Sequence, residues 1–218
     1  MTIRHVIWDF NGTLLDDVDC CVGTLNTLLR ERNLSPISRA DYLARFGFPV
    51  RNFYLALGFD FDREQFEHVS ASYMARYAAR LDAAAPHSGV HAVLDGIRRR
   101  GLPQSVVSAM ERALLVELLA RFGLSAHMAH IRGLEHQNAT SKIEIGRALR
   151  DELGLAAHEL LLVGDTLHDH ELAQALGCPC LLYARGHQAR ERLAASGAPV
   201  IEALHEVEAF LDRDGGRR

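Results

Sequence analysis

Short apolar segments that alternate with helical segments impose the strongest constraint on the fold of this 218-residue chain. Short apolar runs bounded by glycine, proline or polar residues are typical of parallel strands buried on both faces. The predicted strands are 5–10, 103–108, 129–133, 160–165 and 180–184. The predicted helices are 89–100, 109–122, 142–153, 169–176, 187–196 and 202–212. This alternation predicts an α/β fold with a doubly wound parallel sheet, a Rossmann-like core.

The interval 16–84 interrupts the alternation, because it offers only helical segments between the first and second predicted strands. A connection of that length inside a compact protein is expected to have structure of its own. We therefore predict a small helical cap domain over residues 16–84. It is inserted into an α/β core domain formed by residues 1–15 and 85–218.

Charge and hydropathy exclude some classes of partner. The net charge is −4 with 48% hydrophobic residues, so nothing attracts the chain to a polyanion, and no nucleic-acid partner is expected. No apolar run approaches the ~20 residues that span a bilayer, and the N-terminus has no signal-type core. We expect a cytoplasmic protein without a membrane partner, either a monomer or a homodimer.

Polar residues at the ends of the predicted strands are the first candidates for a functional site. Ligands of open α/β sheets bind beyond the carboxyl ends of the strands. Asp9, Ser108 and Asp165 stand at three such ends. The further candidates near them in the chain or in the predicted sheet are Asn11, Thr13, Lys142 and Asp169. We expect these side chains to converge on one pocket.

The carboxylates have both structural and chemical interpretations. Asp9 could cap a turn, since Asn11 and Gly12 form a turn signal. It could also be a nucleophile toward phosphorus, provided that a metal ion neutralises the incoming phosphate. Asp165 and Asp169 could cap a helix. Because Asp165 ends the most apolar predicted strand, oxygen ligands for Mg²⁺ are the favoured interpretation.

Two helix starts carry the remaining candidates. Ser108 could form a capping box with Glu111, or it could bind phosphate at the start of the next helix. The sequence SKIE (141–144) is another capping box and places Lys142 in a first helical turn. A cation is unfavourable there, and Lys142 is the only lysine beside 23 arginines. An anionic partner, either a phosphate or an aspartate, is therefore expected.

The order of these features resembles a known family. The motif DFNGT (9–13), Ser108 after a strand, Lys142 at a helix start and GDTLHD (164–169) are similar to the four motifs of the haloacid dehalogenase superfamily. The closer resemblance is to its phosphoglycolate phosphatase-like branch, in which a helical cap is inserted between the first and second motifs. The resemblance covers roughly residues 5–205.

The resemblance implies how the carboxylates act. Asp9 would attack phosphorus and form an aspartyl phosphate. Mg²⁺ would be the cofactor, bound by Asp9, the backbone carbonyl of Asn11 and Asp165, with Asp169 supporting the metal site. The metal-site residues are thus Asp9, Asn11, Asp165 and Asp169.

The resemblance also implies how the substrate is held. The phosphate would bind Thr13, Ser108 and backbone N–H groups such as that of Ala109. Lys142 would neutralise charge between Asp9 and the phosphate, which makes it a catalytic residue. Arg51 lies in a segment similar to the cap loop that faces the active site, so it is a candidate substrate contact.

Asn11 departs from the family, whose phosphatases carry aspartate at this position to protonate the leaving oxygen and to activate water. Asparagine can orient water but cannot exchange a proton, a loss that typically costs ~10² to 10⁴ in rate. Three explanations are open: a substrate with a good leaving group, partial deamidation, or another acid. The candidates for another acid are Asp16, Asp17, His168 and His170.

The function expected from the resemblance is Mg²⁺-dependent hydrolysis of a small phosphorylated metabolite, either phosphoglycolate-like or a sugar phosphate. The alternative is a phosphate-binding or phosphoryl-accepting regulator with little turnover, which Asn11 favours. Carbon-centred dehalogenation needs no metal and would give Asp165 and Asp169 less reason to be acidic. Phosphonate cleavage would require a lysine in the cap, and 16–84 contains none.

Overall fold

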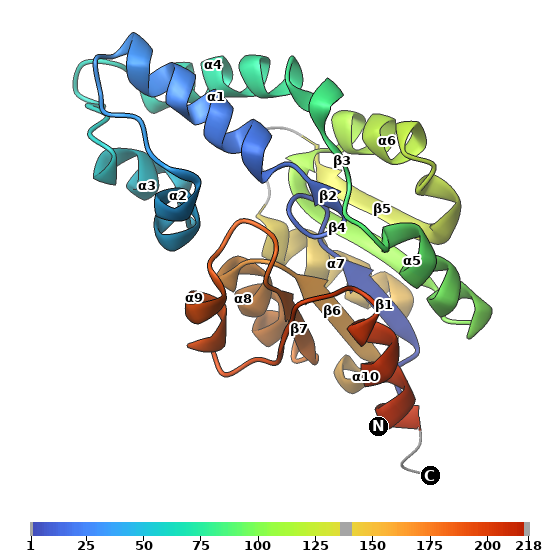
Figure 1. Ribbon diagram of the computed structural model, residues 1–218. Coiled ribbons are helices and arrows are strands. Elements are labelled where there is room, and N and C mark those ends of the chain that lie inside the picture. The colour runs from blue at the N-terminus through green and yellow to red at the C-terminus, as the bar shows by residue number, and fades with distance from the viewer. Residues whose placement is uncertain (1, 136–140, 216–218) are drawn as a thin grey trace.

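A six-stranded sheet lies at the centre of the computed structural model, which describes residues 2–135 and 141–215 (Figure 1). Its strand order is β5-β4-β1-β6-β7-β8, and every neighbouring pair is parallel. The strands are β1 (His5–Trp8), β4 (Gln104–Glu111), β5 (Met128–Leu134), β6 (Leu160–Gly164), β7 (Cys180–Tyr183) and β8 (Val200–Ile201). The predicted α/β fold is thereby confirmed.

Helices cover both faces of the sheet. They are α5 (Val90–Arg99), α6 (Arg112–Arg121), α7 (Lys142–Leu153), α8 (Leu167–Leu176), α9 (Arg190–Ala194) and α10 (Glu206–Gly215), with short 3-10 turns at Leu81–Ala83, Ser125–His127 and Ala157–Glu159. Successive strand side chains point to opposite faces. Val6 and Trp8 of β1 therefore join an apolar cluster with α5, α6 and α10. Ile7 joins a second cluster with α7, α8 and α9, which makes the sheet doubly wound.

Several boundaries differ from the prediction. The strand predicted to end at residue 108 continues to Glu111, so α6 begins at Arg112 instead of residue 109. Strand β8 was not predicted, because Val200 and Ile201 are too few to produce a pattern. Helix α8 begins two residues earlier than predicted, and α9 and α10 are shorter or shifted. Such shifts at element ends do not alter the topology.

Four helices occupy the chain between two short strands that leave and re-enter the core. They are α1 (Val18–Glu31), α2 (Arg39–Arg45), α3 (Val50–Ala56) and α4 (Phe66–Ala78). The short strands β2 (Leu15–Asp16) and β3 (Ala85–Pro86) pair antiparallel, so both crossings lie side by side. Helices α1 and α4 pack along each other beyond the sheet, while α2 and α3 lie near α9 (Figure 1). We call these four helices the cap; its exact domain boundaries stay a prediction.

The cap contacts the loop between β7 and α9. The carbonyl oxygen of Leu43 accepts a hydrogen bond of 3.0 Å from the Ala189 N–H group. The carbonyl oxygen of Phe46 accepts bonds from Gln188 Nε2 at 2.9 Å and from Arg192 Nη1 at 2.5 Å. These bonds hold α2 and the segment after it over the core.

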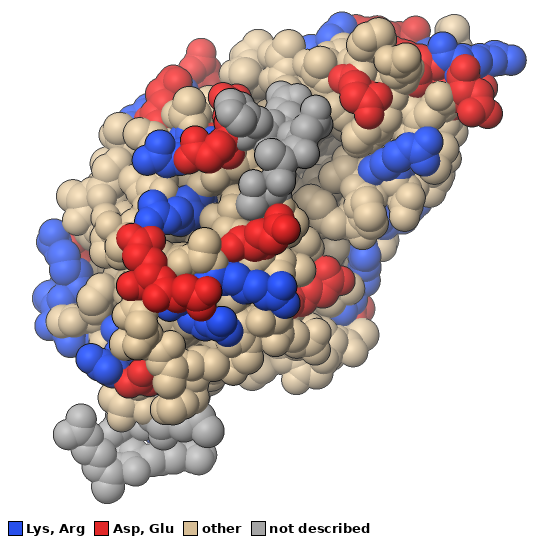
Figure 2. All heavy atoms as spheres, turned by 180° about the vertical axis from the view of Figure 1, so that it is seen from behind, with Lys and Arg blue, Asp and Glu red and all other residues tan. Residues whose placement is uncertain are grey.

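Basic and acidic side chains are interspersed over the core and the outer end of the cap on the face that Figure 2 shows. Within residues 2–135 and 141–215, no helix combines the length and the apolar character that crossing a bilayer requires.

Candidate active site

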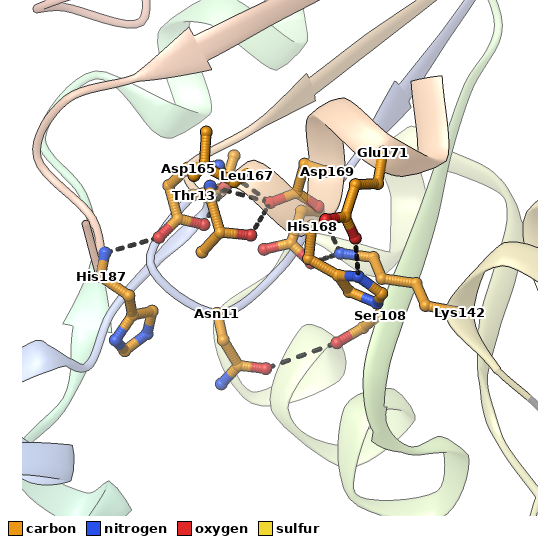
Figure 3. A network of polar contacts seen from close by, with 12 residues as sticks. Asn11, Thr13, Ser108, Lys142, Asp165, Leu167, His168, Asp169, Glu171 and His187 are labelled. Atoms are coloured by element: carbon orange, nitrogen blue, oxygen red, sulfur yellow. Dashed lines mark hydrogen bonds and ion pairs between the residues drawn. The ribbon is translucent and has the colours of Figure 1, made fainter. Parts of the chain in front are cut away.

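The candidate residues gather at the point where the sheet changes direction. From β1 the chain passes to β4 on one side, and later to β6 on the other, so Asp9 lies directly after the strand between them. Ligands of open α/β sheets bind at such a switch point. Lys142 contacts Asp9 there, and Ser108 contacts Asn11. Asn11, Ser108 and Lys142 come from three parts of the chain and lie together in Figure 3.

Lys142 lies between two buried carboxylates. Its Nζ atom donates to Asp9 Oδ1 and, at 2.5 Å, to Asp169 Oδ1. The predicted capping box exists: Ser141 accepts from the Glu144 N–H group, and the Glu144 carboxylate accepts from the Ser141 N–H group. This box starts α7 so that Lys142 is its first residue and points into the site. The anionic partners expected for the only lysine are thus aspartates.

Burial and charge act against each other in this triad. Burial raises the pKa of Asp9 to about 6, although the Lys142 ammonium opposes the shift. Burial would also raise the pKa of Asp169, but Lys142 outweighs it and the net shift is downward. Burial would lower the pKa of Lys142, and the two carboxylates raise it instead. Lys142 therefore stays protonated, and Asp9 is the carboxylate that is less firmly held as an anion.

Asp169 also caps α8. Its Oδ2 atom accepts from the Thr166 N–H group at 3.0 Å and from Thr166 Oγ1 at 2.7 Å. It also accepts from the Asp165 N–H group at 3.2 Å. Both oxygens of Asp169 are therefore engaged, one with the helix start and one with Lys142. This arrangement suits a residue that positions Lys142 and supports the site from behind.

Asp165 is held mainly by neutral donors. Thr13 Oγ1 donates to its Oδ1 at 2.9 Å, and the His187 N–H group donates to its Oδ2 at 2.6 Å (Figure 3). A Cβ atom on Gly12 or Gly186 would lie 2.2 or 2.1 Å from Asp165 Oδ2, so both positions require glycine. Burial raises the pKa of Asp165 well above its usual value, although the imidazole of His187 opposes the shift. A cation bound beside Asp165 would oppose this shift and favour the carboxylate form.

The carboxylates fit a hard divalent cation. One oxygen each from Asp9, Asp165 and Asp169 lie within 4.8 Å of one another, and all three residues are buried. Lys142 supplies a single positive charge against these three carboxylates. Mg²⁺ prefers a few carboxylate oxygens together with water and phosphate. The donor set and its excess negative charge therefore suit Mg²⁺.

Ser108 does not start a helix, which corrects one of its two interpretations. The register between β4 and β5 shifts after Val107, and the strand continues, so the capping box with Glu111 does not form. Instead, Ser108 Oγ accepts from the Met110 N–H group at 3.1 Å and donates to Asn11 Oδ1 at 3.4 Å. The Ser108 hydroxyl consequently faces the Asn11 side chain, in the loop that follows β1.

Asn11 is oriented by its donors. Its Nδ2 atom donates to Asp17 Oδ2 at 2.9 Å and to the Tyr77 hydroxyl at 2.8 Å. A carboxylate can only accept, so the amide nitrogen must face Asp17. The Asn11 carbonyl oxygen is then left on the Ser108 side. The side chain therefore offers an acceptor to whatever occupies the site.

A buried ion pair lies behind Asn11. His187 Nε2 is 3.1 Å from Asp17 Oδ1, and His187 Nδ1 is 3.0 Å from the Tyr42 hydroxyl. Burial would raise the pKa of Asp17, but His187 outweighs it and lowers it to about 2. Burial would lower the pKa of His187, and Asp17 raises it to about 9. Asp17 precedes α1 and also accepts from Tyr77 of α4 at 2.6 Å, whereas His187 follows β7, so the pair ties the cap to the core.

Of the candidates for a substitute acid, the structure brings Asp17 against Asn11. His168 lines the cavity described below, where its ring stacks on Phe48 with 4.7 Å between centroids and its Nδ1 lies 3.1 Å from Glu171. His170 is half-buried, and its Nδ1 has no hydrogen-bond partner among the described residues. Asp16 is exposed and lies 3.7 Å from His87.

Arg51 is not brought to the site. It is exposed on α3, and its guanidinium lies 5.0 Å from the centre of the Phe61 ring. Ala109 does lie at the site and lines the cavity. Thr13 is buried against Asp165, so its hydroxyl is already engaged.

A cavity of about 490 Å³ extends from the carboxylates into the cap. Its core end is lined by Asp9, Asn11, Ser108, Lys142, Asp165 and Asp169. Its cap end is lined mainly by aromatic and aliphatic side chains from α1, α2, α3, α4 and the connection after α2. A ligand that reaches Asp9 therefore also contacts the cap.

Sequence reasoning missed three residues of this site. His187 follows β7 by a few residues, so it lies in the loop beyond the carboxyl end of a parallel strand, where ligands of open α/β sheets bind. Tyr42 and Tyr77 come from cap helices, and nothing local in the sequence relates them to Asn11 or His187.

Comparisons with known proteins agree with the fold and the motif order. The sequence profile described as haloacid dehalogenase-like hydrolase matches residues 6–183. The phosphoglycolate phosphatase of Rhodospirillum rubrum is 29% identical over 209 residues, covering 91% of this chain and 86% of that enzyme. The phosphoglycolate phosphatase of Rhodobacter capsulatus is 25% identical and covers 94% of both chains.

A solved structure shows the same fold. A haloacid dehalogenase-like hydrolase of Streptococcus pneumoniae superposes with a TM-score of 0.83 at 16% identity, covering 95% of this chain and 98% of that one. The chain therefore belongs to the haloacid dehalogenase-like hydrolase family, in its phosphoglycolate phosphatase-like branch, which confirms the prediction of a phosphatase.

Proposed function

We propose that the protein hydrolyses a small phosphomonoester in a Mg²⁺-dependent reaction that passes through an aspartyl phosphate on Asp9. The observation that carries the proposal is the contact of Lys142 with Asp9, beside the buried Asp165, at the switch point of the sheet. The proposal is supported because a buried carboxylate, a cation and further carboxylate oxygens line one cavity. Its phosphoglycolate phosphatase relatives support the choice of a phosphomonoester.

In the first half-reaction, a carboxylate oxygen of Asp9 attacks phosphorus, and the bond from phosphorus to the ester oxygen breaks. The ester oxygen leaves with the bonding electrons and takes a proton from water, because Asn11 cannot supply one. Lys142 holds the attacking carboxylate in place and neutralises part of the negative charge that gathers between it and the phosphate. Mg²⁺, held by Asp9, Asp165 and the backbone carbonyl of Asn11, would supply the further charge neutralisation that lets two anions approach. Ser108 and the N–H group of Ala109 would hold phosphate oxygens, and both residues line the cavity beside Asp9.

In the second half-reaction, water attacks the aspartyl phosphate, which releases inorganic phosphate and restores the Asp9 carboxylate. The side-chain oxygen of Asn11, Oδ1, faces Ser108 and can accept a hydrogen bond from that water. It cannot take the proton, so turnover should be slow compared with an enzyme that has a carboxylate there. Deamidation and a substrate with a good leaving group remain alternatives to a substitute acid.

A phosphoryl-accepting regulator is the second candidate, and Asn11 is the observation that favours it. If no group activates water, the aspartyl phosphate persists. The cavity that encloses a ligand between cap and core favours the enzyme, because a regulator has no need to enclose a substrate. The two differ in the lifetime of the phosphorylated protein, which acid-quenched samples with acetyl phosphate as the donor would measure.

The test uses 4-nitrophenyl phosphate with and without Mg²⁺, for the wild-type protein, Asp9→Ala and Asp19→Ala. Asp19 is an exposed carboxylate on α1 and serves as the control. We expect Mg²⁺-dependent turnover that EDTA abolishes, that Asp9→Ala lowers by at least about 10³-fold, and that Asp19→Ala leaves unchanged. Turnover that survives Asp9→Ala would contradict the proposed nucleophile.

A further inference from the structure

We infer that the organic part of the substrate is apolar and uncharged, so that the preferred substrates are phosphomonoesters of aryl or alkyl groups. Phosphoglycolate and sugar phosphates are then poor substrates. The inference rests on the proposed function, because it concerns the part of the same cavity that lies beyond the phosphate.

The cap end of the cavity is the first observation. It is lined by apolar side chains that include Phe46, Phe48, Val50, Phe53, Phe66 and Met74. These residues come from α3, α4 and the connection between α2 and α3, so an apolar surface surrounds the space opposite Asp9. Small-molecule pockets of this kind bind the apolar part of a ligand and use a few polar groups to orient it.

The distribution of charge is the second observation. None of the described residues that line the cavity is an arginine, and its only lysine, Lys142, is engaged with Asp9 and Asp169. The imidazole of His187 also lines the cavity, but it is already paired with Asp17 and bonded to the Tyr42 hydroxyl. Glu67 and Glu111 at the cavity wall repel anions. A substrate carboxylate would therefore be enclosed without an arginine or an unpaired lysine to bind it, which is costly.

The two arginines that flank the apolar residues 46–50 in the sequence point away from the cavity. Arg45 Nη2 donates to the carbonyl oxygen of Ala56 at 2.5 Å. Arg51 packs its guanidinium on Phe61. Neither lines the cavity among the described residues, so neither is placed to recognise a carboxylate or a second phosphate.

The size of the cavity is the third observation. About 490 Å³ lies within the range of pockets that hold drug-sized ligands. A two-carbon acid phosphate would leave much of the apolar surface in contact with water. An aryl or branched alkyl group would fill that space and remove apolar surface from water on both partners.

The test compares substrates whose leaving groups are alike. We would measure kcat/KM with Mg²⁺ for 2-phenylethyl phosphate, glycerol phosphate and phosphoglycolate, because all three release an alkoxide. 4-Nitrophenyl phosphate reports general phosphatase activity. We expect kcat/KM for 2-phenylethyl phosphate to exceed the other two alkyl esters by at least about tenfold, the scale of a few buried methylenes.

A cation placed in the cap should reverse the preference. Met74→Arg introduces a guanidinium at the apolar cavity wall, whereas Leu55→Arg introduces the same group at an exposed position on α3 outside the cavity. We expect Met74→Arg to lower kcat/KM for 2-phenylethyl phosphate and to raise it for phosphoglycolate. Leu55→Arg should keep the wild-type preference.

The outcomes separate the inference from the proposed function. If no ester, including 4-nitrophenyl phosphate, is hydrolysed, the proposed phosphatase reaction fails and the inference fails with it. If 4-nitrophenyl phosphate is hydrolysed but phosphoglycolate or glycerol phosphate is preferred to 2-phenylethyl phosphate, the reaction stands and the inference is overturned. A preference for 2-phenylethyl phosphate that Met74→Arg reverses supports both.

Discussion

Asp17 fixes the direction of Asn11, because Asn11 Nδ2 lies 2.9 Å from a carboxylate oxygen that can only accept a hydrogen bond. The departure from the family motif is thus matched by a partner six residues later in the chain. An aspartate in place of Asn11 would bring two carboxylates into contact. Two carboxylates at such a short distance cannot both stay ionised, so they would share a proton. Asn11 and Asp17 should therefore be studied as a pair.

Asn11→Asp should restore proton transfer at some cost from its contact with Asp17. We expect kcat for an alkyl phosphate to rise by at least about tenfold, below the full 10² to 10⁴ associated with a general acid or base. The double variant Asn11→Asp with Asp17→Asn keeps an amide–carboxylate pair with the two groups exchanged. Its kcat should be higher than that of Asn11→Asp alone. The measurement is steady-state turnover of one alkyl ester. A kcat that stays at or below the wild-type value in both variants would show that proton transfer at this position is not limiting.

Lys142→Met should destabilise the fold as well as abolish turnover. The substitution leaves Asp9 and Asp169 buried without their shared cation, and breaking such a pair typically costs about 3–5 kcal/mol. Urea unfolding of the apoprotein measures the loss, with Arg147→Met, an exposed position on the same helix, as the control. Adding Asp9→Asn to Lys142→Met should recover part of the stability. A double variant no more stable than the single one would contradict uncompensated charge as the cause.

Asp165→Asn should stabilise the protein in the absence of metal and remove its response to Mg²⁺. The asparagine can keep both hydrogen bonds: its oxygen accepts from the His187 N–H group, and its nitrogen donates to the Thr13 hydroxyl. The substitution also removes a carboxyl group whose charged form is unfavourable, because burial raises the pKa of Asp165 well above its usual value. Thermal unfolding with EDTA should give a higher Tm for the variant.

The same experiment with Mg²⁺ should raise the Tm of the wild-type protein, because a ligand that binds only the folded state stabilises it. The Tm of Asp165→Asn should not change. Asp19→Asn, at an exposed site, should respond as the wild-type protein does. An unchanged Mg²⁺ response in Asp165→Asn would remove Asp165 from the metal site.

His5 should make stability depend on pH in the acid range. Burial lowers the pKa of His5 from 6.5 to about 4, with a further contribution from His130. His5 therefore takes up a proton near pH 6.5 in the unfolded chain but only near pH 4 in the folded chain. Because the unfolded chain binds more protons between these values, acidification through this window favours unfolding. The shift corresponds to about 3 kcal/mol between the two ends.

The measurement is urea unfolding of the wild-type protein, His5→Gln and His68→Gln at several pH values from 4 to 7. His5→Gln should flatten the slope between pH 4 and 6.5. His68 is exposed on α4, and its substitution should leave the slope as in the wild-type protein. Equal slopes for all three proteins would show that His5 takes up its proton with the fold intact.

The strand ends gave the strongest prediction from sequence. Asp9, Ser108 and Asp165 lie at one edge of the sheet because parallel strands present their carboxyl ends together, a property of topology that apolar runs reveal. Lys142 was found from its capping box and from its rarity in the chain. The roles of these residues stay a prediction, whereas the fold is confirmed.

Features that depend on distant contacts escaped the sequence. Ser108 and Glu111 match a capping box in the sequence, but β4 pairs with β5 and continues beyond Ser108 to Glu111. Tertiary structure overrides the local signal here. Arg51 looked like a substrate contact, yet the packing of the cap places it on Phe61. The hydrogen bond between Tyr77 and Asn11 joins residues 66 positions apart. Only the folded cap reveals such a pair.

The burial of Lys142 has a practical consequence for labelling. It is the only side-chain amine of the protein, and the two aspartates that hold it keep it protonated and enclosed. Acylating reagents attack the unprotonated amine, so Lys142 should be inert to them in the folded protein. Modification of Lys142 by a lysine-directed dye will therefore report on unfolding, because this side-chain amine becomes accessible only when the active site comes apart.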